Sequence, residues 1–334
     1  MDGDANPPLV QVTDLSVKFV SREATVHAVN QVSFTARCGE VLCILGESGS
    51  GKSVTLRTLI RLLPRQAQVE GDVRVNGQDV LAMPARELRA LRGGLVSMIF
   101  QEPMTALDPV YSVGQQIGEM VRRHTGCDRK AARARALELL DLVGIPSAER
   151  RLDAYPHELS GGLRQRAMIA IALSCNPQLL LADEPTTALD ATVQVQVLIL
   201  LRRLQRELGM GMIFVTHDLG VAAEIADTIA VMYAGRIVEV GPVAQVLSDP
   251  LHPYTAGLLA STVHGQRKDR DIDAIPGSPP DMRRLPPGCS FAPRCARRSA
   301  ACRTTVPAPQ FIAPERMAAC LNLAAPATLT VATE

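Results

Sequence analysis

The sequence feature with the strongest structural consequence is VLCILGESGSGKSVTLRTLI, at residues 41–60. An apolar run comes first, a glycine-rich loop follows, and a predicted helix opens at Lys52 and Ser53. Glycines let backbone N–H groups turn toward phosphate oxygens, and the helix start adds partial positive charge. Lys52 can reach the terminal phosphates, and the Ser53 hydroxyl can ligate Mg²⁺. The order strand, loop, helix therefore predicts a nucleoside triphosphate site rather than a ligand-free turn, formed by Gly46, Glu47, Ser48, Gly49, Ser50, Gly51, Lys52, Ser53 and Val54.

Two adjacent carboxylates end a second apolar strand, in QLLLADEPTTALD at residues 178–190. We expect Asp183 to hold Mg²⁺ through its water shell. Glu184 points to the other side of the strand, where it can polarise a water molecule for in-line attack on the γ-phosphate. Two solvated acids at a strand end are the alternative, but this strand is apolar enough to be central in a parallel sheet.

Two further apolar strands end in polar side chains. IFVTHD at residues 213–218 delivers His217, which can contact the γ-phosphate or hold the attacking water and the Glu184 carboxylate. VSMIFQEP at residues 96–103 delivers Gln101, whose amide oxygen can ligate Mg²⁺ and sense the γ-phosphate. Neither residue alone indicates a function, since a histidine at a strand end is usually unremarkable.

A second glycine-rich helix start occurs in ELSGGLRQR, at residues 158–166. Backbone amides at such a start form an anion site, and one chain rarely needs two such sites for one nucleotide. We therefore expect two chains to pair head to tail, so that Ser160, Gly161 and Gly162 of each contact the γ-phosphate held by the other.

In this order, the stretches resemble the motifs of ATP-binding cassette (ABC) ATPases: Walker A (GESGSGKS), Q-loop (Gln101), signature (LSGGLRQR), Walker B (QLLLADE), D-loop (Ala188, Leu189, Asp190) and H-loop (His217). The resemblance implies catalytic roles for Lys52, Gln101, Glu184 and His217. It implies Mg²⁺ ligation by Ser53, Gln101 and Asp183. Contacts to ATP are further implied for Ser160, Gly161, Gly162 and Asp190.

Two positions qualify that resemblance. Phe19 is one of only ten aromatic residues and resembles the side chain that stacks on adenine in cassettes, although a core phenylalanine is the alternative. Leu163 stands where many cassettes have glutamine, which leaves the signature serine and glycines intact.

The predicted fold is α/β: a P-loop cassette ATPase with an antiparallel β subdomain, a helical subdomain insert and a small cysteine-containing C-terminal extension. Alternating residues before the loop predict antiparallel strands, and DRKAARARALELLDLVG predicts a helix in the insert. Five prolines within IPGSPPDMRRLPPGC exclude a long helix there. We expect a cassette at 1–250, with the helical subdomain at about 102–165, and the extension at 251–334.

Composition restricts the partners. The formal net charge is +1, from 35 basic and 34 acidic residues, so no positive field favours nucleic acid. The first residues, MDGDANPPLV, lack the pattern of a secretory signal, and no apolar run approaches the ~18 residues of a membrane span. These features predict a cytosolic protein.

Four longer stretches resemble the oligopeptide, dipeptide and nickel importer ATPases within the ABC family: QEPMTALDPVYSVGQQI, MYAGRIVEVGP, DPLHPYTAGLLAS and IPGSPPDMRRLPPGCSFAPRC. The resemblance implies an ATPase subunit of a bacterial peptide importer. Its partners would be a second cassette chain that is a sister subunit, two transmembrane permease subunits and an external solute-binding protein. The resemblance also implies a peripheral position at the cytoplasmic face of the cell membrane. It also implies that Met104, Leu107 and Tyr111 dock a permease helix. A nickel or other small-solute importer is the alternative, and a soluble ATPase acting on DNA or ribosomes is disfavoured by the neutral charge.

Four cysteines near the end of the sequence have the spacing C-x5-C-x6-C-x17-C, at Cys289, Cys295, Cys302 and Cys320. Four thiolates suit an iron–sulfur cluster or zinc, and free thiols are the third possibility. Structural zinc sites favour cysteine pairs two to four residues apart, which this set lacks. Resemblance to the extension of peptide-importer ATPases, some of which carry a [4Fe–4S] cluster, favours the cluster. The expected cofactors are therefore ATP, Mg²⁺ and a [4Fe–4S] cluster.

Overall fold

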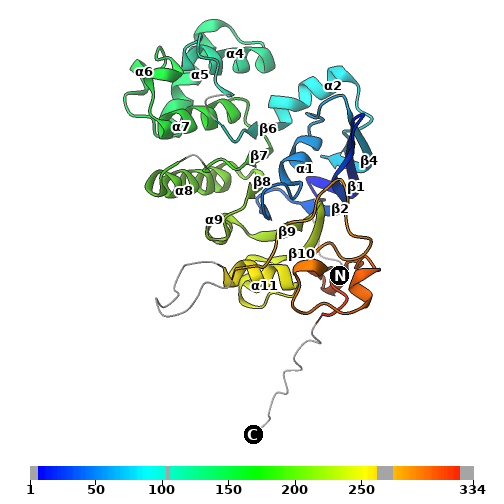
Figure 1. The fold of residues 1–334 in the computed structure, drawn as a ribbon. Helices are drawn as coiled ribbons and strands as arrows, with labels where there is room; N and C mark the ends of the chain where they lie inside the picture. The colour runs from blue at the N-terminus through cyan, green and yellow to red at the C-terminus, as the bar shows by residue number, and fades with distance from the viewer. Residues whose placement is uncertain (1–6, 103–105, 188, 262–273, 324–334) are drawn as a thin grey trace, which may run out of the picture.

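Two β-sheets organise the protein, with helices gathered mainly on one side of the larger sheet (Figure 1). The structure is a computed structural model that describes residues 7–102, 106–187, 189–261 and 274–323. The predicted positions Met104 and Ala188 lie outside these ranges.

The smaller sheet is antiparallel, as the alternating sequence predicts. Its strand order is β2-β1-β4-β5, with bounds β1 (Val10–Val20), β2 (Thr25–Ala36), β4 (Ala67–Val75) and β5 (Gln78–Asp79). In β1, Val10, Val12, Leu15 and Val17 are buried and the intervening residues are more exposed, so one face packs and the other meets solvent.

The larger sheet has the order β11-β12-β10-β9-β3-β8-β7-β6. Its parallel part consists of β3 (Val41–Leu45), β6 (Val96–Ile99), β7 (Leu179–Asp183), β8 (Gly211–Thr216) and β9 (Thr228–Tyr233). Along β3, Val41, Cys43 and Leu45 face one core and Leu42 and Ile44 face another. Burial on both faces explains why these strands read as continuous apolar runs.

Helices of the insert form a group away from the small sheet (Figure 1). They are α4 (Val113–Thr125), α5 (Arg129–Leu142), α6 (Ala148–Arg151), η2 (Pro156–Glu158) and α7 (Gly161–Ala172). The buried residues of α5 and its C-cap lie on one face, at Ala132, Ala136, Leu139, Leu140 and Val143. The remaining helices are α1 (Lys52–Thr58), α2 (Ala85–Ala90), η1 (Leu91–Leu95), α8 (Ala191–Leu208), α9 (Leu219–Ile225), α10 (Val243–Ser248) and α11 (Pro253–Ala260).

The C-terminal extension is built into the main sheet. β10 (Arg236–Pro242) pairs antiparallel with β12 (Arg316–Ala318), which pairs with β11 (Gln310–Ala313). Two short turns, η3 (Ala292–Arg294) and η4 (Ala301–Arg303), carry the cysteine region, and residues 275–289 contain no helix, as the prolines predict. The predicted fold class is confirmed, while the proposed limits 1–250, 102–165 and 251–334 stay predictions.

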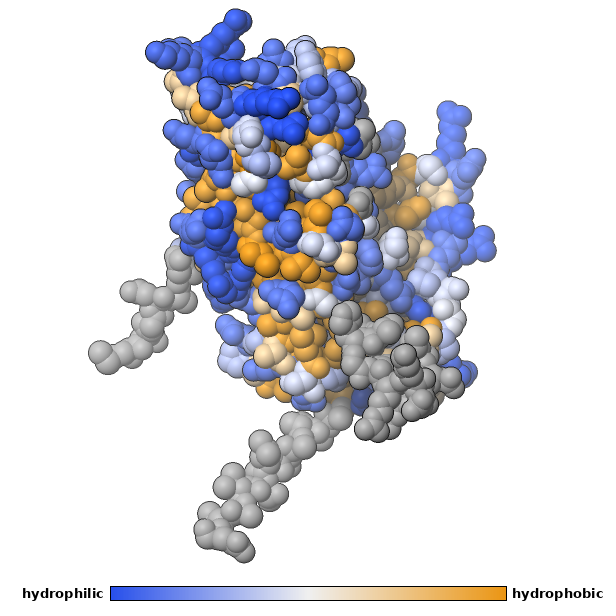
Figure 2. All heavy atoms as spheres, turned by 90° about the vertical axis from the view of Figure 1, so that its left-hand side faces the viewer, coloured by the Kyte–Doolittle hydropathy of each residue, from blue (hydrophilic) through white to orange (hydrophobic). Residues whose placement is uncertain are grey.

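The helix-bearing side of the molecule is largely hydrophilic, with hydrophobic atoms interrupting it in the middle (Figure 2). Helix α8 contributes two exposed apolar side chains, Val195 and Ile199. Within the described ranges, no helix combines the length and the apolar character needed to cross a bilayer.

Candidate active site

The loop from Gly46 to Gly51 joins β3 to α1 and is shaped by close backbone contacts. A Cβ at Gly46 would lie 2.2 Å from the carbonyl oxygen of Met232, and one at Gly51 would lie 2.3 Å from that of Ala28. Gly51 also has φ +103°, a conformation that favours glycine. These positions require glycine because a side chain at either would displace neighbouring backbone.

Lys52 is buried, and its Nζ donates hydrogen bonds to the backbone of its own loop. It donates to the carbonyl oxygens of Gly46 at 2.8 Å and Glu47 at 2.9 Å. Burial lowers the pKa of Lys52, while the nearby carboxylates of Glu184 and Asp183 act in the opposite direction. The ammonium group is therefore held over the loop, where an anionic ligand would stabilise its charged form.

Three side chains contact the Glu184 carboxylate at Oε2, and they follow strands β6, β7 and β8 in the chain. Its Oε2 lies 3.1 Å from His217 Nδ1 and accepts from Thr187 Oγ1 at 2.9 Å and from Gln101 Nε2 at 3.4 Å. Its Oε1 lies 3.7 Å from Lys52 Nζ. Parallel pairing of β7 with both β6 and β8 brings these carboxyl ends to one edge of the sheet.

Asp183 is fully buried at the end of β7 and bonded to the loop helix. Ser53 Oγ donates to Asp183 Oδ1 at 2.6 Å, and Arg57 Nη2 lies 3.4 Å from Oδ2. Burial raises the pKa of Asp183, and these two partners oppose the rise. The predicted Mg²⁺ ligands Ser53 and Asp183 are thus adjacent, and Gln101 lies at the same edge.

A pocket of about 210 Å³ opens over the loop, lined by Val26, Ala28, Ser48, Gly49, Ser50, Gly51, Lys52, Ser53, Val54, Gln101, Glu184 and Met282. Ser50 Oγ is buried there without a hydrogen-bond partner among the described residues. An unpartnered hydroxyl, inward-facing glycines and a buried ammonium fit a phosphate chain. Mg²⁺ that binds with a nucleotide is held by one or two carboxylates together with phosphate oxygens. Asp183 can supply the carboxylate, and Ser53 can add a hydroxyl oxygen.

The signature residues and Asp190 lie at other helix starts. Ser160 caps α7 by accepting from the Leu163 N–H at 3.4 Å, and Asp190 caps α8 by accepting from the Val193 N–H at 3.0 Å. Among the described residues lining the loop pocket, Ser160, Gly161, Gly162 and Asp190 are absent. Leu163 packs partly buried against the helical core, which accounts structurally for an apolar residue there.

Phe19 packs, partly buried, against the core beneath the small sheet. It pairs in register with Val26, which lines the loop pocket, but Phe19 is not among that pocket's described lining residues. The core position is observed, and adenine stacking stays a prediction.

The prediction of an iron–sulfur cluster on the four cysteines is wrong. Cys289, Cys295, Cys302 and Cys320 all lie in the described ranges and are free. Within those ranges no group of three or more His, Cys, Asp or Glu side chains is arranged to hold a metal ion. Cys302 Sγ instead lies 3.3 Å from Ser299 Oγ, and Cys320 Sγ accepts from the Asn322 N–H at 3.4 Å. Burial raises the thiol pKa of Cys289 and Cys295, whereas hydrogen bonds with Ser299 lower that of Cys302.

Sequence reasoning missed three residues around the loop because they come from distant parts of the chain. Met282 lines the loop pocket, Tyr254 OH accepts from the Glu47 N–H at 3.1 Å, and Arg294 Nη1 donates to the Glu47 carboxylate at 2.9 and 3.1 Å. No sequence pattern used above pairs these positions. No signal in the sequence distinguishes Arg294 from the other arginines nearby, because its burial is visible only in the structure.

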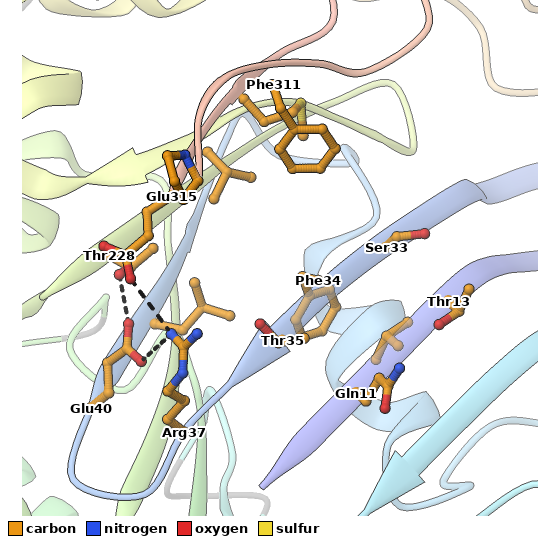
Figure 3. Close-up of a pocket in the computed structure, with 15 residues that line it drawn as sticks. Gln11, Thr13, Ser33, Phe34, Thr35, Arg37, Glu40, Thr228, Phe311 and Glu315 are labelled. Carbon is orange, nitrogen blue, oxygen red and sulfur yellow. Dashed lines mark hydrogen bonds and ion pairs between the residues drawn. The ribbon is translucent and has the colours of Figure 1, made fainter. Parts of the chain in front are cut away.

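A separate cavity of about 300 Å³ lies between the small sheet and the β11–β12 hairpin (Figure 3). Phe34 and Phe311 are among its lining residues, and Arg37 lies at one side between Glu40 and Glu315. None of the predicted ATP-site residues lines this cavity, so the loop pocket is the candidate active site.

Two family models match separate parts of the chain. Residues 29–187 match the family model described as "ABC transporter", and residues 238–302 match "Oligopeptide/dipeptide transporter, C-terminal region". A solved dimeric structure of the ATP-binding cassette MJ0796, in a post-hydrolysis state bound to ADP and Pi, superposes with a TM-score of 0.63 at 28% identity. It covers 70% of this chain and 98% of that one.

Two curated relatives match over most of their length. A putative peptide import ATP-binding protein of Brucella melitensis is 50% identical over 313 residues, which is 90% of this chain and 93% of the relative. The oligopeptide transport ATP-binding protein OppD of Salmonella typhimurium is 47% identical over 314 residues, 94% of this chain and 93% of the relative. The chain therefore belongs to the ABC transporter family, as an ABC ATPase that carries the oligopeptide/dipeptide transporter C-terminal region.

Proposed function

We propose that this protein is the ATP-hydrolysing subunit of a bacterial ABC importer that takes up di- and oligopeptides. The observation that carries the proposal is the Glu184 carboxylate, held at the exit of β7 by His217, Gln101 and Thr187 and facing Lys52. The peptide part is supported by the names of the Brucella and Salmonella relatives and by the C-terminal match. No observation favours nickel, DNA or ribosomes as the target.

The loop residues bind ATP, and Glu184 promotes its hydrolysis. The N–H groups of residues 48–53 surround the phosphates, and Lys52 moves its ammonium from the loop carbonyls to the terminal phosphates. Ser53, Asp183 and Gln101 would hold Mg²⁺, which would supply positive charge to offset that of the phosphates. Glu184 then orients the attacking water as general base.

His217 positions the base. An ionised carboxylate can only accept hydrogen bonds, so the 3.1 Å contact to Glu184 Oε2 places the proton on His217 Nδ1. Together with the Thr187 hydroxyl, this donor fixes one carboxylate oxygen and leaves the other, Oε1, toward Lys52 and the pocket. A fixed base stays aligned with the in-line direction of attack.

Two cassettes act as a head-to-tail pair, and the second is a sister subunit. Ser160, Gly161 and Gly162 begin α7 away from their own chain's loop pocket, and Gly161 has open space around it. Two N–H groups there can bind the γ-phosphate of the opposite chain. The dimeric form of the MJ0796 cassette supports pairing of this kind.

A permease subunit docks in the groove between α4 and α5. Tyr111 and Gly118 are among the residues that line this groove of about 500 Å³, and Val110 beside it is exposed. Leu107, another predicted docking residue, is buried and packs internally, so Tyr111 is the described candidate that remains. The protein would then sit peripherally on two permease subunits at the cytoplasmic face, supplied by an external solute-binding protein.

The test is ATP hydrolysis and labelled tripeptide uptake by the reconstituted transporter with all its subunits. Glu184→Gln should lower kcat by about 100-fold or more and abolish uptake while ATP still binds, because only the base is lost. Glu207→Gln, an exposed glutamate near the end of α8, is the matched control and should behave as wild type. Unchanged hydrolysis in Glu184→Gln would refute the mechanism, and nickel uptake without peptide uptake would refute the solute.

A further inference from the structure

The C-terminal extension reaches the phosphate loop through one ion pair. Arg294 Nη1, in η3, donates to both carboxylate oxygens of Glu47, at 2.9 and 3.1 Å. The two residues are 247 positions apart. The arginine side chain is 7% exposed and the glutamate side chain 25%, so water screens this pair less than a surface pair.

Arg294 is itself fixed by the extension. Its Nε donates to the Pro276 carbonyl at 3.0 Å, and its Nη1 also lies 3.4 Å from the Tyr233 hydroxyl. The guanidinium therefore has defined partners on both sides and cannot follow Glu47 if the loop moves. Holding five N–H donors in a planar fork suits arginine and not lysine for this task.

A second anchor, formed by aromatic side chains, reaches the same residue. Tyr254 OH accepts from the Glu47 N–H at 3.1 Å, and Tyr254 is fully buried. Its ring lies 4.6 Å from that of Tyr233 and 5.4 Å from that of Phe291, measured between centroids. Three of the ten aromatic residues thus form a packed support beneath Glu47.

Glu47 passes these restraints to the phosphate-binding groups. Its carbonyl oxygen accepts from Lys52 Nζ at 2.9 Å and from the Ser50 N–H at 3.3 Å. One residue is therefore bonded to the extension by its side chain, to α11 by its N–H group, and to the loop by its carbonyl group. Any rotation of Glu47 would move the two groups that should meet phosphate.

We propose that Arg294 is a positioning residue of the nucleotide site, by which the C-terminal extension holds the phosphate loop in its binding conformation through Glu47. The inference rests on the proposed function, because it assumes that this loop binds ATP. It gives the extension a role at the nucleotide site that requires no metal on its cysteines. A loop positioned in advance binds with less loss of conformational entropy, so the pair should affect ATP affinity more than the chemical step.

The experiment measures the Kd of a fluorescent ATP analogue, kcat and thermal stability for Arg294→Gln, Glu47→Gln and the double variant, in the full-length chain. Each single change should raise Kd about tenfold and change kcat by less than about twofold, since the base and its partners are untouched. The double variant should be no worse than either single one, because both remove the same contact.

The control is Arg283→Gln, an exposed arginine of the same segment that pairs with Asp281 and should bind ATP as wild type. If Arg294→Gln does not fold, Glu47→Gln and Arg294→Lys carry the same test. Lysine keeps the positive charge at this position but lacks the planar fork of N–H donors that pairs with both carboxylate oxygens. Wild-type affinity in the single variants, or additive losses in the double variant, would overturn the proposal. Failure of the proposed function is distinguishable, since the wild-type protein itself would then not bind the analogue.

Discussion

The phosphate loop before α1 and the signature turn before α7 are both glycine-rich helix starts, yet they are constructed in opposite ways. The loop is enclosed: Gly46 and Gly51 press against neighbouring backbone, Lys52 is buried, and Glu47 is held by Arg294 and Tyr254. At the signature turn, Ser160 supplies a cap and no heavy atom of the described chain lies within 4 Å of a Cβ built at Gly161. The first is complete within one chain, and the second is open to a partner.

A substitution at Gly51 and one at Gly161 should therefore affect different properties of the protein. Where glycine is required by the chain's own backbone, a side chain should damage folding and binding together. Where glycine faces open space, a side chain should leave the fold intact and interfere only with what approaches from outside. Substitutions at these glycines and at the residues around them test this contrast.

Gly51→Ala should show the largest loss. A Cβ there would lie 2.3 Å from the Ala28 carbonyl oxygen at φ +103°, so we expect a cost of about 3 kcal/mol and an approximately 100-fold loss of ATP affinity. Calorimetry of unfolding and of ATP binding measures both effects. Gly39→Ala is the control, because it has φ +74° with open space around it and should leave ATP binding unchanged. Equal behaviour of the two variants would show that the close contact is unimportant.

Acid should lower the stability of the fold through His252, which lies at the start of the helix that contacts the enclosed loop. His252 caps α11 by accepting from the Tyr254 N–H at Nδ1, and burial, aided by Arg297, lowers its pKa from 6.5 to about 4. The unfolded chain therefore takes up a proton before the folded one does as pH falls. Stability present above pH 6.5 should decline between about pH 6.5 and 4, by about 3 kcal/mol in total. Thermal melts against pH measure the decline, and His252→Asn should remove this part of it; an unchanged pH profile in that variant contradicts the assignment.

Gly161→Ala should reverse the pattern of Gly51→Ala. With open space around the position, thermal stability should stay within about 0.5 kcal/mol of wild type. Hydrolysis by the assembled transporter should fall about 30-fold, because a methyl group obstructs the N–H groups that face the other chain's γ-phosphate. Steady-state ATPase assays beside melting curves measure the two quantities. A variant that hydrolyses normally would show that the signature turn does not meet phosphate.

Met282→Ala should have the smallest effect. The side chain contributes part of the wall of the loop pocket, and its carbonyl oxygen, which the substitution keeps, accepts from the His27 N–H at 2.9 Å. Loss of apolar contact should weaken ATP binding about threefold, with kcat unchanged. Titration of a fluorescent ATP analogue measures the change, and the neighbouring Arg283→Gln is the control. A loss as large as that of Arg294→Gln would mean that Met282 also positions the loop.

The two errors of sequence reasoning have a common physical cause. The spacing of Cys289, Cys295, Cys302 and Cys320 gave a ligand count, but these residues lie in short turns and at a strand end, where spacing does not specify how side chains approach. Ser299 and Asn322 satisfy two of the sulfurs instead. The resemblance likewise implies that Leu107 docks a permease helix, but its side chain is buried.

The local parts of this protein follow from residues that are neighbours in the chain. An apolar strand, a glycine loop and a helix start are contiguous, so the phosphate loop and the strand-end positions of Gln101, Asp183, Glu184 and His217 could be recognised from neighbouring residues. Which of these strand ends meet depends on the fold, because the order β6-β7-β8-β3 comes from packing between distant segments. The same holds for Arg294 and Glu47, whose pairing depends on where the extension packs and on no periodicity along the chain.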